Sequence, residues 1–349
     1  MKILVALDNT PSSEAALLVV AQHKWPEGSQ VKLLNVIDRS RSKKVIEKLT
    51  KKQSPLLNRQ NTKQLLDEIV SNLKARIPEL PISGEVVEGD PKSDIVKVAR
   101  QWKSDLIVIG STSKKSIDKL VLGSVSQAVL QKADCPTLIV RLGRMSGHIQ
   151  RGEDFTRIVV ASDGRNSSKA AFAWLASQSW PKELVYKVMS VIPEEEKNKN
   201  ADAQKAAWMM RHWSYLKERV EDGLRKDAEK LGKGLDNEYI SVDVVPGNPK
   251  DKVVEIAKNW RAELIVTGAQ SKSHLDKIFQ GSVSQAIAVK AASCVLVIKG
   301  LDKHGMRLSD KASQYDSNDK NYLPEPETTK QSTVDNAPPG DSDAPFKMF

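Results

Sequence analysis

The sequence predicts an α/β protein made of two tandem, open, mostly parallel five-stranded sheets with helices on both faces, followed by a disordered C-terminal tail. Three observations lead to this class. Apolar runs typical of buried strands alternate with stretches of helical spacing. The same order of elements occurs twice within the 349 residues. From His304 onward the chain loses this pattern and becomes rich in Asp, Ser, Asn, Pro and Thr.

The first repeat begins with a strand and a helix whose limits can be read from their residues. The apolar run from Lys2 ends at Asp8. Thr10-Pro11-Ser12 then predicts a helix start, because threonine or serine caps free N–H groups and proline fits the first turn. Ala and Leu recur at helical spacing up to His23. Further strands are expected at 31–37, 84–87, 106–109 and 137–140, and further helices at 62–75, 93–102 and 125–132.

The second repeat follows the first at two constant offsets. Residues 3–8 align with 158–163 at an offset of 155, and residues 86–141 align with 244–299 at an offset of 158 without a gap. A period of this size indicates duplication of a whole domain. The expected boundaries are domain 1 at 1–141, a linker at 142–153, domain 2 at 154–300 and the tail at 304–349. The tail cannot bury enough apolar surface to offset its ordering entropy, so we expect it to be disordered.

Composition excludes several classes of protein. The formal net charge of +10 can favour polyanions. However, the chain has no aromatic-interleaved RNA motif, zinc spacing or helix-turn-helix pattern, so nucleic-acid binding is not favoured. No apolar stretch reaches the roughly 18 residues that would span a membrane. Cys135 and Cys294, one in each repeat, do not make a disulfide framework, and we therefore expect a cytoplasmic protein.

Both repeats carry the same loop pattern after their fourth strand. Residues 110–128 and 268–286 each read Gly-x-x-Ser-x(9)-Gly-Ser-Val-Ser-Gln-Ala. Glycine allows close approach to the backbone, and a helix N-terminus presents free N–H groups to phosphate. The pattern therefore predicts an anion site in each repeat.

These residues resemble the universal stress protein family in its tandem two-domain form. The matching pieces are the loop pattern, the first strand ending in Asp8 or Asp163, and the second strand ending in Val36-Ile37 or Val191-Ile192. The resemblance covers about 1–141 and 155–300. It implies a Rossmann-like fold of the adenine-nucleotide α-hydrolase type and a role in the stress response.

The nucleotide-binding branch of that family carries Gly-x-x-Gly-x(9)-Gly-Ser/Thr, so the resemblance implies ATP as ligand, with Mg²⁺ held through the phosphates. The aspartates would meet the ribose or base edge, and the valines would contact adenine. The first glycine would approach the ribose and phosphates, and the Gly-Ser-Val at the helix start would bind the phosphates. The implied residues are Asp8, Val36, Gly110, Ser113, Gly123, Ser124 and Val125 in the first repeat, and Asp163, Val191, Gly268, Ser271, Gly281, Ser282 and Val283 in the second.

Both copies depart from that motif, because Ser113 and Ser271 stand where the family has its second glycine. If the position needs a positive φ, a residue other than glycine costs about 1–2 kcal/mol, which is roughly tenfold in affinity. Lys114 and Lys272 follow these serines and could either pair with a triphosphate or serve solubility. The two aspartates likewise have an alternative role, which is to cap the next helix.

No residue pattern indicates catalysis. The chain lacks Gly-x-x-x-x-Gly-Lys-Ser/Thr, the Ser-Gly-Gly-x-Asp-Ser loop of ATP pyrophosphatases and the signatures of class I synthetases. It also shows no nucleophile–base pair, and its five histidines have no metal-ligand spacing.

Two functions therefore stay open. One is a non-catalytic regulator that binds ATP or a related adenine nucleotide in one or both repeats. The other is a stress interaction protein that binds no nucleotide and acts on an unidentified protein partner through its dimer-like surfaces. In this family the last strand pairs across a dimer axis, which implies that 137–140 and 295–298 pair within this chain as a pseudo-dimer. Further homo-oligomers are compatible with that arrangement.

Overall fold

Strands and helices alternate twice along the chain in the computed structural model, which describes residues 1–38, 59–111, 122–142, 147–193, 203–232, 239–269, 282–302 and 305–307. The first repeat comprises β1 (Lys2–Leu7), α1 (Pro11–Gln22), β2 (Gln30–Asp38), α3 (Arg59–Arg76), β3 (Ile82–Gly89), α4 (Pro91–Trp102), β4 (Leu106–Gly110), α5 (Ser124–Lys132) and β5 (Thr137–Val140). A short helix, α6 (Gly147–Arg151), connects the repeats. The second repeat comprises β6 (Arg157–Ala161), α7 (Asn166–Ala176), β7 (Val185–Ile192), α8 (Ala203–Ala228), β8 (Ile240–Pro246), α9 (Pro249–Asn259), β9 (Leu264–Gly268), α10 (Ser282–Lys290) and β10 (Cys294–Ile298).

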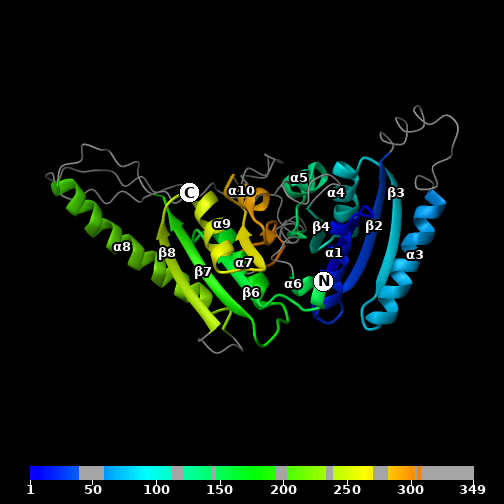
Figure 1. The fold of residues 1–349 in the computed structure, drawn as a ribbon, viewed down its shortest axis with the longest axis horizontal. Coiled ribbons are helices and arrows are strands. Elements are labelled where there is room, and N and C mark those ends of the chain that lie inside the picture. Colours follow the sequence, from blue (N-terminus) through cyan, green and yellow to red (C-terminus); the bar gives the residue numbers. More distant parts are fainter. Residues whose placement is uncertain are drawn as a thin grey trace, which may run out of the picture.

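The two five-stranded halves form one continuous sheet. Its strand order is β3-β2-β1-β4-β5-β10-β9-β6-β7-β8. Within each half the neighbouring strands are parallel, and at the junction β5 and β10 are antiparallel, with Leu138 opposite Leu296. The pairing of the two last strands within one chain, which the family resemblance implies, is confirmed. In Figure 1, α3 and β3 accordingly lie at one end of the molecule, and α8 and β8 at the other.

Helices cover both faces of this sheet, and each face has one apolar core that runs through both repeats. One core contains buried residues of β1, α1 and α3 together with residues of α6, α7 and α8. The other contains buried residues of α4, α5, α9 and α10. Because both cores cross the junction, separating the repeats would expose apolar surface on both faces of the sheet.

Local chemistry explains where the helices begin. Thr10 is the N-cap of α1, and its side chain and that of Ser13 form a capping box. The side chains of Asp90 and Asn248 accept hydrogen bonds from first-turn N–H groups of α4 and α9, and each of these residues is followed by a proline.

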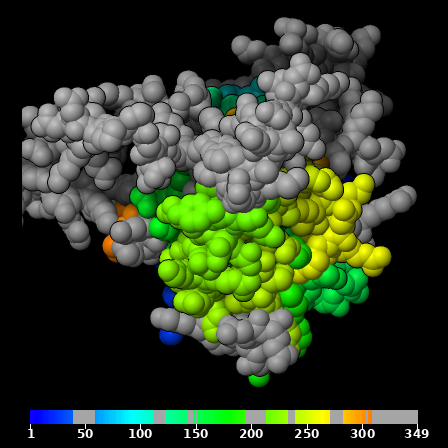
Figure 2. Space-filling view, turned by 90° about the vertical axis from the view of Figure 1, so that its left-hand side faces the viewer, coloured from blue at the N-terminus to red at the C-terminus, as the bar shows by residue number. Residues whose placement is uncertain are grey.

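Helix α8 has 26 residues and forms the outer end of the second repeat. Figure 2 looks at this end and shows the lime-green residues of α8 over it. Among the described residues, no helix is both long and apolar enough to cross a membrane.

Each repeat places a buried cation at the C-terminal end of a helix of the other repeat. The Arg141 guanidinium, 3% exposed, donates hydrogen bonds to the carbonyls of Ala288 and Val289 in α10. The Lys299 ammonium, 6% exposed, donates to the carbonyl of Leu130 in α5. Arg141 and Lys299 are equivalent at the 158-residue offset. The last carbonyls of a helix carry partial negative charge, so the two cations cap both helices reciprocally across the junction.

The segment after each last strand also crosses to the other repeat. In the segment 142–153, which composition marks as a polar linker, Ile149 and His148 are buried. His148 Nδ1 lies 3.6 Å from Glu263 Oε1 at the start of β9. In the second repeat, the Arg307 Nε atom donates to Asp105 Oδ1, 2.9 Å away, at the equivalent start of β4. Apart from residues 305–307, the predicted tail lies outside the described residues.

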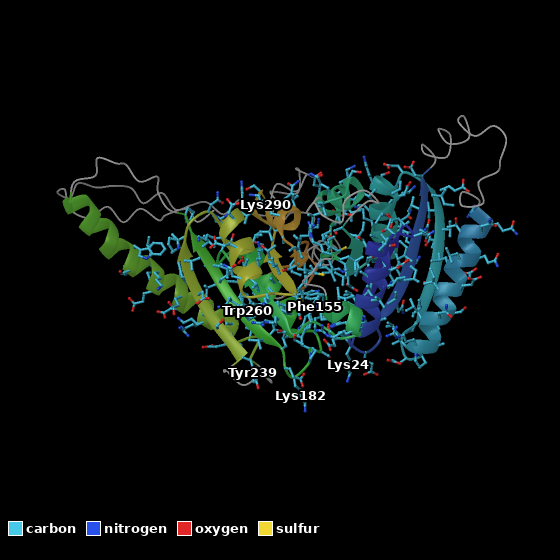
Figure 3. The ribbon with its side chains drawn as sticks, in the orientation of Figure 1. Lys24, Phe155, Lys182, Tyr239, Trp260 and Lys290 are labelled. Carbon is cyan, nitrogen blue, oxygen red and sulfur yellow. The ribbon has the colours of Figure 1, made fainter. Side chains whose placement is uncertain are left out.

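A third contact joins the repeats around His23. Its Nδ1 atom lies 2.7 Å from Asp154 Oδ2. Its ring centroid lies 4.5 Å from that of Trp25 and 4.7 Å from that of Trp180, so one imidazole contacts the equivalent tryptophan of each repeat. Lys24 and Ser179 form an antiparallel bridge beside this cluster. Figure 3 shows Lys24 at the lower edge of the molecule and Phe155 nearer its middle.

Burial of Lys299 predicts a specific dependence of stability on pH. Burial lowers the pKa of this ammonium from 10.5 to about 8. The cost of burying its charge is therefore fully present below pH 8 and is relieved as the pH rises from 8 to 10.5. Over that range the free energy of unfolding of the wild type should rise relative to Lys299→Met by at most about 3 kcal/mol. Urea titrations of both proteins at several pH values measure this difference.

The control is Lys97→Met, which removes an exposed lysine of α4. The free energy of unfolding of this variant should have the same pH dependence as that of the wild type. If the Lys299→Met and wild-type curves remain parallel from pH 8 to 10.5, the ammonium is not held in the buried position described above.

Candidate functional site

The predicted site residues lie where the strand order of each repeat reverses. In the first repeat β1 lies between β2 and β4, and the helices that follow β1 and β3 cover opposite faces of the sheet. In the second repeat β6 lies between β7 and β9 in the same way. Crevices outside the carboxyl ends of parallel strands at such a reversal are where open α/β sheets bind ligands.

The second repeat has a cavity of about 270 Å³ at this position. Five of the residues that the sequence singles out line it together, from the ends of three strands and the start of one helix: Asp163, Val191, Gly268, Ser282 and Val283. A larger hollow on the described surface, about 620 Å³, is lined by polar side chains of α3 alone, and it does not enclose a ligand from more than one element.

The lining of the cavity combines apolar and polar side chains from different elements. Met189 and Val191 come from β7 and Val253 from α9. Ser282 and Ser284 come from the start of α10, which follows β9. Asp163 follows β6, which lies between β7 and β9 in the sheet. An apolar group joined to an anion would match this mixed lining.

Sequence reasoning missed one charged residue of this cavity. Arg165 lines it, and its Nε atom lies 3.8 Å from Asp163 Oδ2. Its position only two residues after Asp163, in a turn that the first repeat fills with Thr10, is the signal that could have found it.

The two aspartates hold the start of the helix that follows them. In the first repeat Asp8 Oδ1 accepts hydrogen bonds from the Thr10 hydroxyl at 2.6 Å and the Thr10 N–H at 3.2 Å. In the second repeat Asp163 Oδ1 accepts from the Arg165 N–H at 3.1 Å and from the Ser168 hydroxyl. The aspartates are not themselves the helix caps that the sequence leaves open as an alternative, because Thr10 and Arg165 are the N-caps of α1 and α7. None of these hydrogen bonds uses Oδ2 of either carboxylate.

The corresponding residues of the first repeat lie at equivalent places. Asp8, Val36 and Gly110 stand at the carboxyl ends of β1, β2 and β4, and Gly123-Ser124-Val125 starts α5. Gly123 is the N-cap of α5 and has no side chain, so it makes no side-chain cap hydrogen bond to the first N–H groups of this helix. Ser113, Ser271 and Gly281, with the neighbouring Lys114 and Lys272, lie outside the described residues.

Gly110 and Gly268 have a packing role that does not depend on a ligand. A Cβ atom on Gly110 would lie 2.6 Å from the carbonyl carbon of Ser12, and one on Gly268 would lie 2.3 Å from that of Ser167. Both contacts are with backbone in the first turn of α1 or α7, which cannot move aside easily. These glycines therefore let the fourth strand of each repeat end against the helix that follows the first strand.

The described residues show neither a metal-binding cluster nor a reactive thiol. They contain no group of three or more His, Cys, Asp or Glu side chains placed to hold a metal ion. Burial raises the pKa of the Cys135 thiol to about 12 and that of the Cys294 thiol to about 11, so neither is a thiolate at neutral pH.

Comparison with known proteins identifies the family. A model of the universal stress protein family matches residues 1–141 and 154–299, and the chain belongs to this family as a tandem two-domain member. It is 30% identical over 153 residues to a universal stress protein of Methanocaldococcus jannaschii, a match covering 40% of this chain and 94% of that protein. Another universal stress protein of that organism is 43% identical over 60 residues, 17% of this chain and 35% of that protein.

A solved structure shares the tandem fold. The crystal structure of a universal stress protein from Archaeoglobus fulgidus superposes with a TM-score of 0.57 at 18% identity, covering 85% of this chain and 96% of that chain. This likeness extends over both repeats and shows that the fold described above occurs in another universal stress protein.

The packing role of Gly268 predicts that Gly268→Ala destabilises the protein without any ligand present. Forcing a methyl group against the Ser167 backbone should cost about 1–3 kcal/mol of unfolding free energy. Guanidinium titration measures this cost. Gly223→Ala is the matched control, because this position lies in α8 with open space around it. That substitution should stabilise by about 0.5–1 kcal/mol. Wild-type stability in Gly268→Ala would show that the glycine is needed only for a ligand.

Proposed function

We propose that this universal stress protein binds ATP or a related adenine nucleotide in one or both repeats and acts as a regulator rather than as an enzyme. The observation that carries the proposal is the cavity of the second repeat, where Asp163, Val191, Gly268, Ser282 and Val283 meet at the strand-order reversal. The family resemblance assigns these same positions to adenine, ribose and phosphates.

The mixed lining of the cavity supports this ligand class. Val191 and Met189 would pack against the flat apolar faces of adenine. The N–H groups at the start of α10, with the exposed Ser282 hydroxyl, would bind the phosphates, because a helix N-terminus favours negative charge. Asp163 Oδ2 would accept a hydrogen bond from a ribose hydroxyl or the base edge. Mg²⁺ would be held through the phosphates, since the described residues form no metal site of their own.

A regulatory role follows from what surrounds the site. Members of this family are generally regulatory. The residues that line the cavity include no histidine or cysteine, and the Ser168 hydroxyl that donates to Asp163 is buried at the start of α7, where this hydrogen bond holds the turn between β6 and α7. Nucleotide would instead stabilise the conformation that binds it and so change which surface the protein presents to a partner.

The double variant Ser124→Asp/Ser282→Asp tests the proposal. Both serines are exposed at the first position of a helix, where a carboxylate is favourable, so the fold should be retained. The new carboxylates would repel the phosphates. Millimolar Mg-ATP should raise the melting temperature of the wild type, and this rise should be lost in the double variant. Ser71→Asp adds a carboxylate to the exposed face of α3 and should respond like the wild type.

A direct assay decides between the two functions. The protein is purified without added nucleotide and denatured, and the released small molecules are separated by chromatography. Release of an adenine nucleotide supports the proposal. Absence of released nucleotide, together with no thermal shift of the wild type in Mg-ATP, would overturn it. The remaining function would then be that of an interaction protein that acts through its dimer-like surfaces.

A further inference from the structure

The helix that begins at each candidate site ends against the other repeat. Helix α5 starts at the site of the first repeat, and the carbonyl of Leu130 near its end accepts a hydrogen bond from the Lys299 ammonium. Helix α10 starts at the cavity of the second repeat, and the carbonyl of Ala288 near its end accepts from the Arg141 guanidinium. Leu130 and Ala288 are equivalent at the 158-residue offset, as the two cations are. The same contact therefore occurs twice, once in each direction across the junction.

These contacts fix the far ends of two helices whose near ends face the ligand. Leu130 and Ala288 are each the third residue from the end of their helix, where carbonyls have no N–H partner within the helix. The start of α5 is fixed as well, because the Ser126 hydroxyl donates to the Gly110 carbonyl at 2.7 Å. Helix α5 is thus held by its own repeat at the start and by the other repeat at the end.

Burial lets each cation act over the whole length of its helix. Helices α5 and α10 have nine residues each, which corresponds to about 13 Å. Across about 13 Å, two opposite unit charges in an effective dielectric of about 20 change an affinity about eightfold, whereas in bulk water they change it less than twofold. Arg141 is 3% exposed and Lys299 is 6% exposed, so solvent screens them much less than it screens surface charges.

Other cations at these helix ends are exposed. Arg100 of α4 donates to the Lys132 carbonyl at the end of α5, but its side chain is 53% exposed and is paired with Asp134. Lys132 is itself exposed, and Lys290 at the end of α10 is exposed and paired with Asp251. Solvent and the partner carboxylates weaken the effect of these charges at the start of each helix. The buried pair is therefore better placed to act on a phosphate.

The two buried cations differ in whether they titrate near neutral pH. Burial lowers the pKa of Lys299 from 10.5 to about 8, and the nearby Cys135 and Asp134 offset part of that shift. The Cys135 thiol stays neutral below pH 10, because burial raises its own pKa to about 12. Arg307 and Asp105, which also face this thiol, are hydrogen-bonded to each other. The arginine that caps α10 keeps its charge throughout this range.

We propose that each nucleotide site is completed electrostatically by the other repeat: Lys299 is a positioning residue for phosphate bound at the start of α5, and Arg141 is one for phosphate bound at the start of α10. Each cation holds the helix end and adds positive potential at the helix start without contacting the ligand. This inference rests on the proposed function, because it concerns the same two sites. It predicts that ATP affinity falls with rising pH in the first repeat and not in the second.

Variants that confine ATP to one site separate the effects of the two cations. Ser282→Asp should confine ATP to the first repeat, and Ser124→Asp should confine it to the second. Adding Lys299→Met to Ser282→Asp should weaken ATP binding about three- to tenfold at pH 7, whereas adding Arg141→Met should change it less than twofold. In the Ser124→Asp protein the two results should be exchanged. Calorimetric titration of the full chain in excess Mg²⁺ measures these affinities.

The pH profile is a readout that a loss of packing would not produce. Lys299 loses its charge between pH 7 and 9.5, so the ATP affinity of the Ser282→Asp protein should fall about three- to tenfold over this range. Adding Lys299→Arg keeps the charge and should abolish this fall while retaining the affinity at pH 7. The Ser124→Asp protein should show no fall. Adding Lys132→Met to Ser282→Asp removes an exposed lysine from the end of α5 and should leave the affinity unchanged at each pH.

Titration with adenosine separates an electrostatic effect from a structural one. Adenosine lacks phosphate, so its affinity should stay within twofold in all these proteins. Equal losses of ATP and adenosine affinity, an equal effect of Lys299→Met on both sites, or an ATP affinity of the first repeat that does not depend on pH would each overturn the inference. Where only one repeat binds ATP, the same comparison of the two cations applies to that repeat. Binding of neither ATP nor adenosine by the wild type would instead contradict the proposed function itself, and this inference with it.

Discussion

The antiparallel pairing of β5 with β10 is the contact on which the rest of the molecule depends. Every residue of both strands is buried, and each would otherwise be the open edge of a parallel sheet. The pairing fixes the distance and the relative orientation of the two repeats. Only in that arrangement can Arg141 reach the end of α10, Lys299 reach the end of α5, and the two crossing segments meet Glu263 and Asp105. The two repeats therefore stabilise each other through backbone, charge and apolar contacts at once.

The sequence predicts the order of strands and helices well because apolar runs, caps and prolines act locally. It does not predict contacts between residues that are about 150 positions apart. Arg141 and Lys299 read as ordinary basic residues after a strand, yet both are buried against the other repeat. Residues 142–153 read as a polar linker, yet Ile149 packs into the core that the repeats share. In each case the partner is supplied by the junction, which a local pattern does not contain.

The residues of the candidate site also divide into those that the sequence predicts and those that it does not. The positions at strand ends follow from the repeat and from the family resemblance, and the structure brings five of them around one cavity in the second repeat. The reason for Gly268 could not be read from its motif, because the backbone that it approaches belongs to α7, about 100 residues earlier in the chain. Arg165 belongs to no motif, and only a comparison of the two repeats at equivalent positions makes it stand out. Ser113 and Ser271 lie outside the described residues, so their effect on affinity stays a prediction.

The unequal pair Arg141 and Lys299 has a consequence for how such a molecule can change over generations. In a dimer of identical chains, any substitution at the two-fold axis appears on both sides at once, and the assembly falls apart on dilution. In a fused chain the two halves are encoded separately and held together at any concentration. One half can therefore acquire an arginine where the other has a lysine. Selection then acts on a substitution in one half without a matching change in the other. The duplicated gene thus permits a division of labour that a symmetric assembly forbids.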